Sequence, residues 1–451
     1  MLLLLPDLFL DNARVWDGTG APVQEGVDLL VHDGRIVAIG SDLTPPEGAR
    51  LLDVSGATVI PGLIDSHVHL SMDPGAAHRH DAPAEHRVML AQHLRAYLAC
   101  GVTTILDPAV LPEELALIRS TLAEGTPGPR YLPLGPPFAP RGGYPAVVIP
   151  TLPTVATPAE VERQLDLVVA EGVVGIKTTV EQGFGPHVWP LYAPEVSAAI
   201  RDGARARTLP VYSHAVSPKE QRIAMEALGA TVLVHPLEPA RRKAVERAAA
   251  AGVYEMSTLS ILDSMLTLWE PERLDDPLIR LTVPARELAT ARDPAVGRAF
   301  ASEMIATIYP MLPRWDLVRR VGFTRRTAEH RLTAQGEAVR ALHDAGVPIV
   351  MGSDAGNWPI IPFEFHGPTS IRELEVLGEH GFSPAEALTS ATATPARMLG
   401  LDVGTLVVGQ GADLVVVEGD PLVDLRALRT VRYTVRAGDA RTPTEWMGGP
   451  S

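Results

Sequence analysis

The pattern of apolar and polar positions divides the chain into three parts. Residues 1–60 alternate short β-branched runs with turns, and the dipeptide Asp33-Gly34 between two such runs is a strong hairpin signal. Residues 399–451 show the same pattern. We therefore expect the two ends of the chain to form one small β-sandwich domain, with residues 61–398 inserted between them.

Strand-like and helix-like segments alternate in the middle part. Amphipathic stretches such as 158–171 and 193–207 separate most of the apolar runs. This alternation is typical of an α/β fold, and eight strands predict a TIM-like (β/α)8 barrel. Catalytic side chains of such a barrel stand at the carboxyl ends of its strands. The strand candidates are 58–64, 101–106, 130–134, 172–177, 209–214, 230–235, 252–257 and 346–353.

A long insertion, residues 258–345, separates the seventh and eighth strand candidates. Its pattern is mostly helical. The insertion could consist of extra helices that pack on the barrel or form a subunit contact. Alternatively, it could be a lid that covers the strand ends and contacts substrate. Its large apolar side chains are Met265, Leu266, Leu268, Trp269, Met304, Ile308, Tyr309, Met311 and Trp315.

The composition narrows the functional classes. The chain has 451 residues, and its formal net charge of −15 argues against a nucleic-acid-binding protein. Its single cysteine, Cys100, excludes an intrachain disulfide and a thiolate metal cage. No apolar run reaches the roughly 18 residues of a membrane span. The apolar first residues lack the basic start and the cleavage site of a signal peptide, so we expect a cytoplasmic protein.

An apolar, β-branched run over residues 59–66 leads into His67-Val68-His69. Residues two apart on a strand point to the same face, so both imidazoles can enter one site. Neutral imidazole is a common ligand of zinc and related ions. Two histidines at a polar strand end can also simply be solvated, so this pair alone leaves the question of a metal site open.

Four further strand candidates carry candidate ligands at their carboxyl ends. The fourth, fifth, sixth and eighth end in Lys177, His214, His235 and Asp354, respectively. A single histidine or lysine at a strand end is more often structural. Because the strand ends of a barrel converge on one spot, however, these side chains together with the His-x-His pair predict a shared metal centre.

This set of residues resembles the amidohydrolase superfamily in its binuclear-metal form. The resemblance covers nearly the whole chain, including 33–36 near its start and 411–414 near its end. It implies two divalent metal ions, with zinc as the first choice, and a homo-oligomer. By this resemblance the buried ion is bound by His67, His69 and Asp354, the outer ion by His214 and His235, and Lys177 bridges both as a carbamate formed with CO2.

The resemblance also implies a hydrolytic mechanism. Two neighbouring dications need a bridging anion, and a carbamate supplies two oxygens where an ammonium supplies none. The ions lower the pKa of a bound water and polarise the scissile carbonyl. Asp354 takes the proton of that water and returns it to the leaving nitrogen. A lysine in a salt bridge is the alternative role for Lys177.

Local sequence differences favour one branch of the superfamily. Deaminases typically have His-x-x-Glu after the fifth strand, whereas Ser217 lies three residues after His214. Hydantoinases and dihydroorotases typically have His-x-Pro after the eighth-strand aspartate. In this chain Asp354 is followed by Ala355-Gly356-Asn357 instead. The run 353–356 and the later His366-Gly367 resemble the prolidase and imidazolonepropionase-related branch.

We therefore expect a metal-dependent amidohydrolase that cleaves the C–N bond of an N-acyl amino acid, a dipeptide or a related small amide. An esterase, lactonase or organophosphate hydrolase is an alternative, because the same activated water attacks esters and phosphotriesters. An imidazolonepropionase-like hydrolase of cyclic amides is another, although that enzyme is usually mononuclear and lacks the bridging lysine. A catalytically inactive scaffold is the last, but such proteins usually lose ligands.

Substrate-binding residues are predicted less directly. Members of this branch often have Gly-Gly-His after the third strand, where this chain has Gly142-Gly143-Tyr144. Arg141 could pair with a substrate carboxylate, and Tyr144 could donate a hydrogen bond. Both could equally be ordinary loop residues. Three further candidates for substrate contact are Tyr212, His187 and His366.

Overall fold

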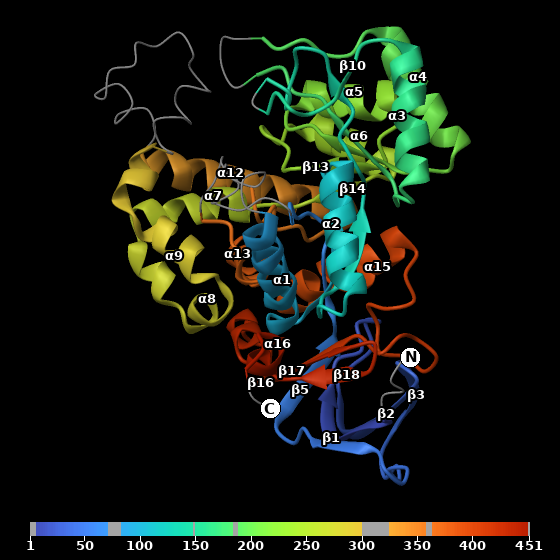
Figure 1. The fold of residues 1–451 in the computed structure, drawn as a ribbon, viewed down its shortest axis with the longest axis vertical. Helices are drawn as coiled ribbons and strands as arrows, with labels where there is room; N and C mark the ends of the chain where they lie inside the picture. The colour runs from blue at the N-terminus through green and yellow to red at the C-terminus, as the bar shows by residue number, and fades with distance from the viewer. Residues whose placement is uncertain are drawn as a thin grey trace.

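Strands from both ends of the chain form one sheet in the computed structural model, which describes residues 6–70, 83–147, 149–183, 188–299, 324–357 and 363–449. The sheet occupies the end of the molecule where both chain termini lie (Figure 1). Its order is β18-β17-β16-β5-β1-β2-β3, with β4 paired to β1. The strands are β1 (Leu8–Val15), β2 (Gln24–His32), β3 (Arg35–Gly40), β4 (Arg50–Asp53), β5 (Ala57–Pro61), β16 (Leu414–Glu418), β17 (Val431–Arg436) and β18 (Asp439–Arg441).

Two sequence predictions about this sheet are confirmed. Asp33 and Gly34 form the β2–β3 turn with φ of 47° and 70°, as a two-residue hairpin turn requires. The two termini meet where β5 pairs antiparallel with β16. Alternate side chains of both terminal segments, among them Leu29, Val59 and Leu414, fill a common apolar core.

The middle of the chain forms parallel strands. Most of them make two sheets, β6-β7-β8 and β11-β12-β13-β14-β15, and each of the eight strand candidates overlaps one of these strands. A separate parallel pair is formed by β9 (Ala139–Pro140) and β10 (Thr154–Val155). Backbone hydrogen bonds also join the edges of the two sheets, from Phe138 N to Lys177 O (2.8 Å) and from Ser66 N to Met351 O (3.0 Å). The strands are β6 (Leu63–Asp65), β7 (Val102–Asp107), β8 (Arg130–Pro133), β11 (Ile176–Thr179), β12 (Val211–His214), β13 (Val232–Val234), β14 (Tyr254–Met256) and β15 (Ile349–Val350).

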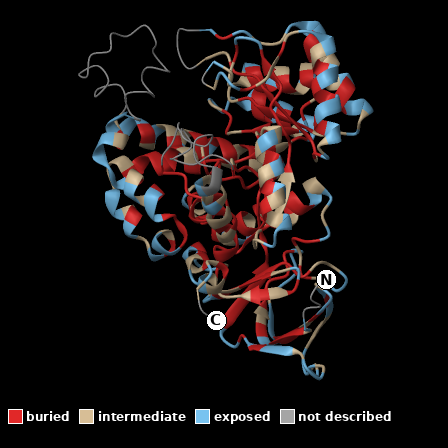
Figure 2. Ribbon diagram, in the orientation of Figure 1, coloured by how far each residue is buried: buried red, intermediate tan, exposed pale blue. Residues whose placement is uncertain are grey.

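Helices follow the parallel strands and cover them, so that the strands are the most buried part of the molecule (Figure 2). Several helices begin at a capping box whose first residue is extended, as at Thr157–Glu160 and Ser217–Glu220. The helices are α1 (Pro83–Ala99), α2 (Pro112–Ala123), α3 (Pro158–Ala170), α4 (Pro194–Ala206), α5 (Pro218–Leu228), α6 (Arg242–Ala251), α12 (Arg325–Asp344), α13 (Pro368–Glu379), α14 (Pro384–Ser390), α15 (Ala393–Leu399) and α16 (Pro443–Trp446). Nowhere in the described ranges does a helix have the length and apolar composition of a membrane span.

The insertion is helical over its described part, as predicted. It contains α7 (Ser260–Met265), α8 (Pro277–Thr282), α9 (Ala285–Arg292) and α12. Met265 and Leu266 lie in the main core, and Leu268 and Trp269 pack against it. These four residues therefore anchor the start of the insertion. The remaining predicted apolar residues, from Met304 to Trp315, lie outside the described residues. Both roles of the insertion, extra helices at the barrel or a subunit contact on the one hand and a lid on the other, therefore stay predictions.

The single strand expected at 58–64 is in fact two strands that belong to different sheets. β5 ends at Pro61 in the terminal sheet, and β6 begins at Leu63 in a parallel sheet. Gly62 makes the transition where the chain passes directly over Thr103. A Cβ atom on Gly62 would lie 2.3 Å from Thr103 Oγ1 and 2.7 Å from its Cγ2. Only glycine allows this approach.

We predict that Gly62→Ala lowers the free energy of unfolding by about 1–3 kcal/mol, the usual cost of overpacking. Gly40→Ala is the matched control, because a Cβ there meets only Leu43 Cδ2 at 3.9 Å. Denaturant unfolding of both variants measures the difference. Equal losses in the two variants would contradict the close approach at Gly62.

Candidate metal centre

The first two predicted ligands lie directly after β6. His67 is buried, and its carbonyl accepts a hydrogen bond from Asp354 N (2.8 Å). His69 N donates to Ala355 O (2.8 Å), and Val68 forms a parallel bridge with Ala355. The segments after the first and the eighth parallel strands therefore run side by side and carry their side chains into the same space.

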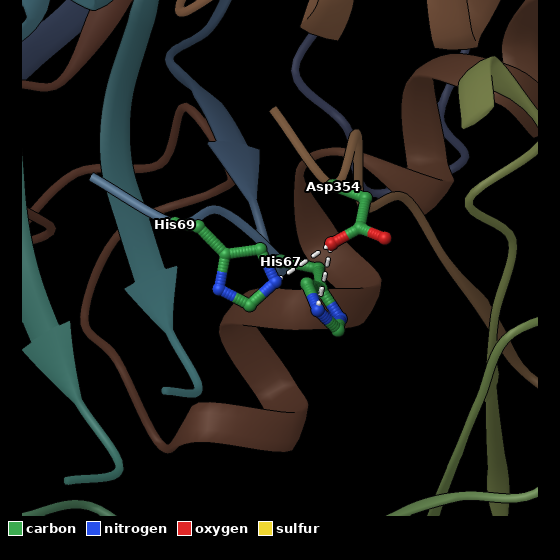
Figure 3. Close-up of side chains that lie close together, drawn as sticks. All are labelled: His67, His69 and Asp354. Atoms are coloured by element: carbon green, nitrogen blue, oxygen red, sulfur yellow. Dashed lines mark ion pairs between the residues drawn. The ribbon is translucent and has the colours of Figure 1, made fainter. Parts of the chain in front are cut away.

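His67, His69 and Asp354 converge on one point (Figure 3). Asp354 Oδ1 lies 3.1 Å from His67 Nε2 and 2.9 Å from His69 Nε2. Despite these distances, Oδ1 is buried and forms no hydrogen bond of normal geometry with any described residue. Across the described ranges this is the one group of three histidine or acidic residues whose donor atoms all lie within 4.8 Å of one another.

The predicted outer ligands lie next to this trio. The ring centroids of His214 and His235 are 4.5 Å apart, and the ring centroids of His235 and His67 are 5.3 Å apart. Burial is the main cause of the lowered pKa of His67 and His235, and the charge of Lys177, which is itself buried on β11, adds to it. The structure thus brings together all the side chains predicted as metal ligands.

The protonation states suit metal binding. Burial lowers the pKa of His67 to about 3, against the attraction of Asp354. Burial, and then proximity to His214, lowers the pKa of His235 well below its usual value. Burial also opposes ionisation of Asp354, but His67 and His69 hold its pKa well below the usual range. The site therefore presents neutral imidazoles and an ionised carboxylate, the forms that ligate a metal ion.

Backbone strain occurs at the ends of three neighbouring strands. His235, Thr258 and Asp354 have φ of 74°, 36° and 56°. Non-glycine residues in this region cost about 1–3 kcal/mol each and persist where the surrounding structure holds them. Here the strained conformations turn His235 and Asp354 toward the site.

A buried carboxylate, Asp65, fixes the two ligand segments relative to each other. Its Oδ1 accepts hydrogen bonds from His67 N (3.1 Å) and Ser353 N (3.0 Å), and its Oδ2 accepts one from Ser370 Oγ (2.6 Å). Asp65 precedes His67 by two residues, yet sequence analysis did not single it out. No local sequence pattern shows that its partners Ser353 and Ser370, far along the chain, come close to it.

The donor set fits a divalent transition-metal ion. Imidazole nitrogens and a carboxylate oxygen are the usual ligands of such ions, and zinc takes four of them. A cation at the trio would also compensate the buried charge of Asp354 Oδ1, which accepts no hydrogen bond of normal geometry from the described residues.

Of the predicted substrate contacts, Tyr144 is next to the metal centre. The centroid of its ring lies 4.9 Å from that of the His214 ring. The Tyr144 ring also stacks on the Trp189 ring, with a centroid separation of 5.6 Å. Its carbonyl accepts a hydrogen bond from Thr179 Oγ1 (2.7 Å), which fixes the loop to the end of β11. Burial, and then the charges of Asp354 and Glu181, raise the pKa of the Tyr144 phenol, so it is a neutral donor.

The other candidates lie in different surroundings. Arg141 is 61% exposed and pairs with Glu160 (2.7 Å). Tyr212 is buried in a separate apolar cluster with Leu106 and Met256. His366 is buried against Tyr97, whose hydroxyl lies 2.8 Å from His366 Nδ1. His187 lies outside the described residues.

His366 nevertheless borders the segment that carries Asp354. A Cβ atom on Gly356 would lie 2.5 Å from His366 Cε1. This ring therefore packs against the turn two residues after the candidate ligand. The glycine of the run 353–356 is needed for that packing.

Sequence analysis missed three polar residues that touch the candidate ligands. Glu181 Oε2 lies 3.4 Å from His214 Nε2, Thr258 Oγ1 lies 2.9 Å from His235 Nδ1, and Asn357 Nδ2 donates to Asp354 Oδ2 (3.2 Å). Each follows the carboxyl end of a parallel strand. That position is the signal that could have identified them, since polar residues just after barrel strands face the site.

Comparison with known proteins identifies the family to which this fold and site correspond. Residues 58–441 match the model of the amidohydrolase family. A dihydroorotase of Pelobacter propionicus is 34% identical over 119 residues, which is 26% of either chain. An adenine deaminase of Methanoregula boonei is 34% identical over 157 residues, 34% of this chain and 23% of the deaminase. The chain thus matches about a quarter of the length of these curated relatives.

A solved structure shares the fold over a much longer range. A Xaa-Pro dipeptidase crystallised with methionine in its active site superposes with a TM-score of 0.72. The match covers 97% of this chain and 100% of the dipeptidase at 21% sequence identity. The expected resemblance to the amidohydrolase superfamily is confirmed, and the chain shares the fold of the dipeptidase.

We predict that Zn2+ stabilises the metal-free protein against thermal unfolding through the His67–His69–Asp354 trio. A free zinc concentration 100 times the dissociation constant adds about 2.7 kcal/mol. Asp354→Ala should lose most of this gain, whereas Asp166→Ala, at an exposed acid on α3, should keep it. Thermal denaturation with and without Zn2+ tests this. A zinc-dependent gain of wild-type size in Asp354→Ala would remove Asp354 from the site.

Proposed function

The chain belongs to the amidohydrolase family, and on that premise we propose that it is a metal-dependent hydrolase of the C–N bond in an N-acyl amino acid, a dipeptide or a related small amide. The observation that supports this most strongly is the convergence of His67, His69 and Asp354 beside His214 and His235. We also propose that the two parallel sheets form one closed (β/α)8 barrel within residues 61–398. The flanking segments 1–60 and 399–451 would then be the two parts of the second domain, the expected β-sandwich.

We assign the ligands as the superfamily resemblance implied. His67, His69 and Asp354 would hold one divalent ion, and His214 and His235 the other. Lys177 would bridge them as a carbamate. Burial lowers the pKa of Lys177 to about 7, and the neutral amine is the form that reacts with CO2. Bound ions supply polarisation of the amide carbonyl and a lowered pKa for water.

The chain's own residues would then handle protons and orientation. Asp354 Oδ2 is held by Asn357, so this oxygen has a fixed direction in which to accept a proton and return it to the leaving nitrogen. The Tyr144 hydroxyl is a neutral donor beside the same centre. We assign Tyr144 to substrate binding ahead of Arg141, which is exposed and paired.

Amide cleavage is favoured over deamination by the segment after β12. A deaminase-type glutamate would replace Ser217, but Ser217 instead caps α5 and accepts a hydrogen bond from Glu220 N. The fold shared with a dipeptidase that binds methionine is consistent with an amino-acid product. The short match to a dihydroorotase favours a cyclic amide as the second candidate substrate.

The first test is metal content per chain in the wild type and in Lys177→Ala, with hydrolysis of a panel of N-acyl amino acids and dipeptides. We expect about two ions in the wild type, as in other two-metal hydrolases. The variant should bind fewer ions and lose turnover by at least about 100-fold, because it lacks the bridging group. A single ion that is unaffected by the substitution would overturn the bridging role of Lys177.

The second test compares bond types on the same enzyme. Matched linear amides, a cyclic amide and the corresponding esters should be ranked by kcat/KM. We expect linear amides to be turned over, with esters also cleaved because they are intrinsically more reactive. Turnover of esters, lactones or phosphotriesters without any amide hydrolysis would replace the proposed function by the esterase alternative.

A further inference from the structure

Glu181 is a buried carboxylate at the metal centre that the ligand assignment above does not use. It lies two residues after β11 and four residues after Lys177. Its Oε2 is the hydrogen-bond partner of His214 Nε2 at 3.4 Å, and its Oε1 accepts from Gly183 N (2.7 Å). Among the described residues, His214 is its one ion-pair partner. Its negative charge is therefore directed at a candidate metal ligand.

The surrounding structure keeps Glu181 close to His214. Val180 N donates to His214 O (2.8 Å), so the two strand ends are joined immediately beside the pair. The next residue, Gln182, donates its backbone N–H to Glu220 Oε1 (2.9 Å). Glu220 is also the capping-box residue of α5, the helix that begins after His214, and accepts from Ser217 N (2.8 Å).

This contact determines which nitrogen of His214 is free to bind a metal ion. A neutral imidazole carries one proton, and the nitrogen that donates to a carboxylate is the protonated one. Nε2 would be that nitrogen in His214, so Nδ1 keeps its lone pair. His235 shows the complementary arrangement, since its Nδ1 faces Thr258 Oγ1 and its Nε2 is left for a ligand bond.

We propose that Glu181 is a positioning residue that holds His214 as the Nε2–H tautomer and so presents His214 Nδ1 to the outer metal ion. The proposal rests on the proposed function, because it needs that ion. A carboxylate that accepts from a metal-bound imidazole orients the ring and makes it a more basic ligand. It also adds a negative charge beside a dication.

Direct ligation by Glu181 is the competing explanation. Two ligands of a tetrahedral zinc ion, each about 2.0–2.1 Å from the metal, come within about 3.4 Å of each other. Two observations favour the positioning role. The His214 ring directs its Nε2 at Glu181 with hydrogen-bond geometry, and Glu181 forms no compact three-residue group with His214 and His235.

The experiment measures metal binding and needs no substrate. Full-length protein is stripped with a chelator and titrated with Co2+, following heat by calorimetry and cobalt absorption bands by spectroscopy. The variants are Glu181→Gln, Glu181→Ala, His214→Ala, Thr258→Val and, as a surface control, Glu246→Gln on α6. Thermal denaturation of each metal-free variant confirms that it is folded.

We expect Glu181→Ala to weaken the second, outer ion by about 10–100-fold while the first ion binds as in the wild type. Glu181→Gln keeps an acceptor oxygen and should lose less, with the cobalt bands of the outer site shifted. Thr258→Val, which removes the partner of His235, should weaken the same ion. Glu246→Gln should match the wild type.

Two results would overturn the positioning role while leaving the proposed function intact. Unchanged outer-site affinity and spectrum in both Glu181 variants would show that the contact is irrelevant to metal binding. Loss of the outer ion in Glu181→Gln as complete as in His214→Ala would make Glu181 a ligand. A wild-type protein that binds no metal would overturn the proposed function together with this inference, and it is recognised before any variant is compared.

Discussion

The candidate metal centre depends on the hydrogen bonds that the buried carboxylate of Asp65 accepts. They join segments that are 288 residues apart in the chain, one carrying His67 and the other carrying Asp354 next to Ser353. Burial raises the pKa of Asp65 to about 6, against the hydrogen bonds from Ser353, Ser370 and His67. These donors all favour the ionised carboxylate, so the same contacts that keep Asp65 charged also align the ligand segments.

A consistent arrangement surrounds the histidines. One nitrogen of each of three rings has a partner outside the centre: Met256 Sδ for His67 (3.2 Å), Glu181 for His214 and Thr258 for His235. The other nitrogen is left to face the centre. Unpaired imidazoles would be free to rotate or to change tautomer, and metal affinity would fall accordingly. The partners therefore matter as much as the ligands, although they would not touch an ion.

Sequence analysis identified the candidate ligands because they lie near strand ends and follow clear apolar runs. Each of the eight strand candidates overlaps a parallel strand, and the side chains of Lys177, His214, His235 and Asp354 lie close together as expected. The partners could not be predicted in this way. Asp65 and Glu181 act on residues of other strands, so their roles depend on spatial register rather than on local pattern. The break at Gly62 was missed for a similar reason, since only the neighbouring Thr103 reveals it.

The terminal sheet has a direct part in shaping the centre. β5 continues through Gly62 into β6, the strand that leads to His67, and Gly62 N donates to Asp413 O (2.8 Å). Asp413 is buried and is itself held by Arg436 (3.2 Å) and by Ala437 N (2.8 Å). The C-terminal strands thus clamp the start of the first ligand segment. Because that segment is fixed by Asp413 at one end and by Asp65 at the other, the two ends of the chain are needed to place the first pair of candidate metal ligands.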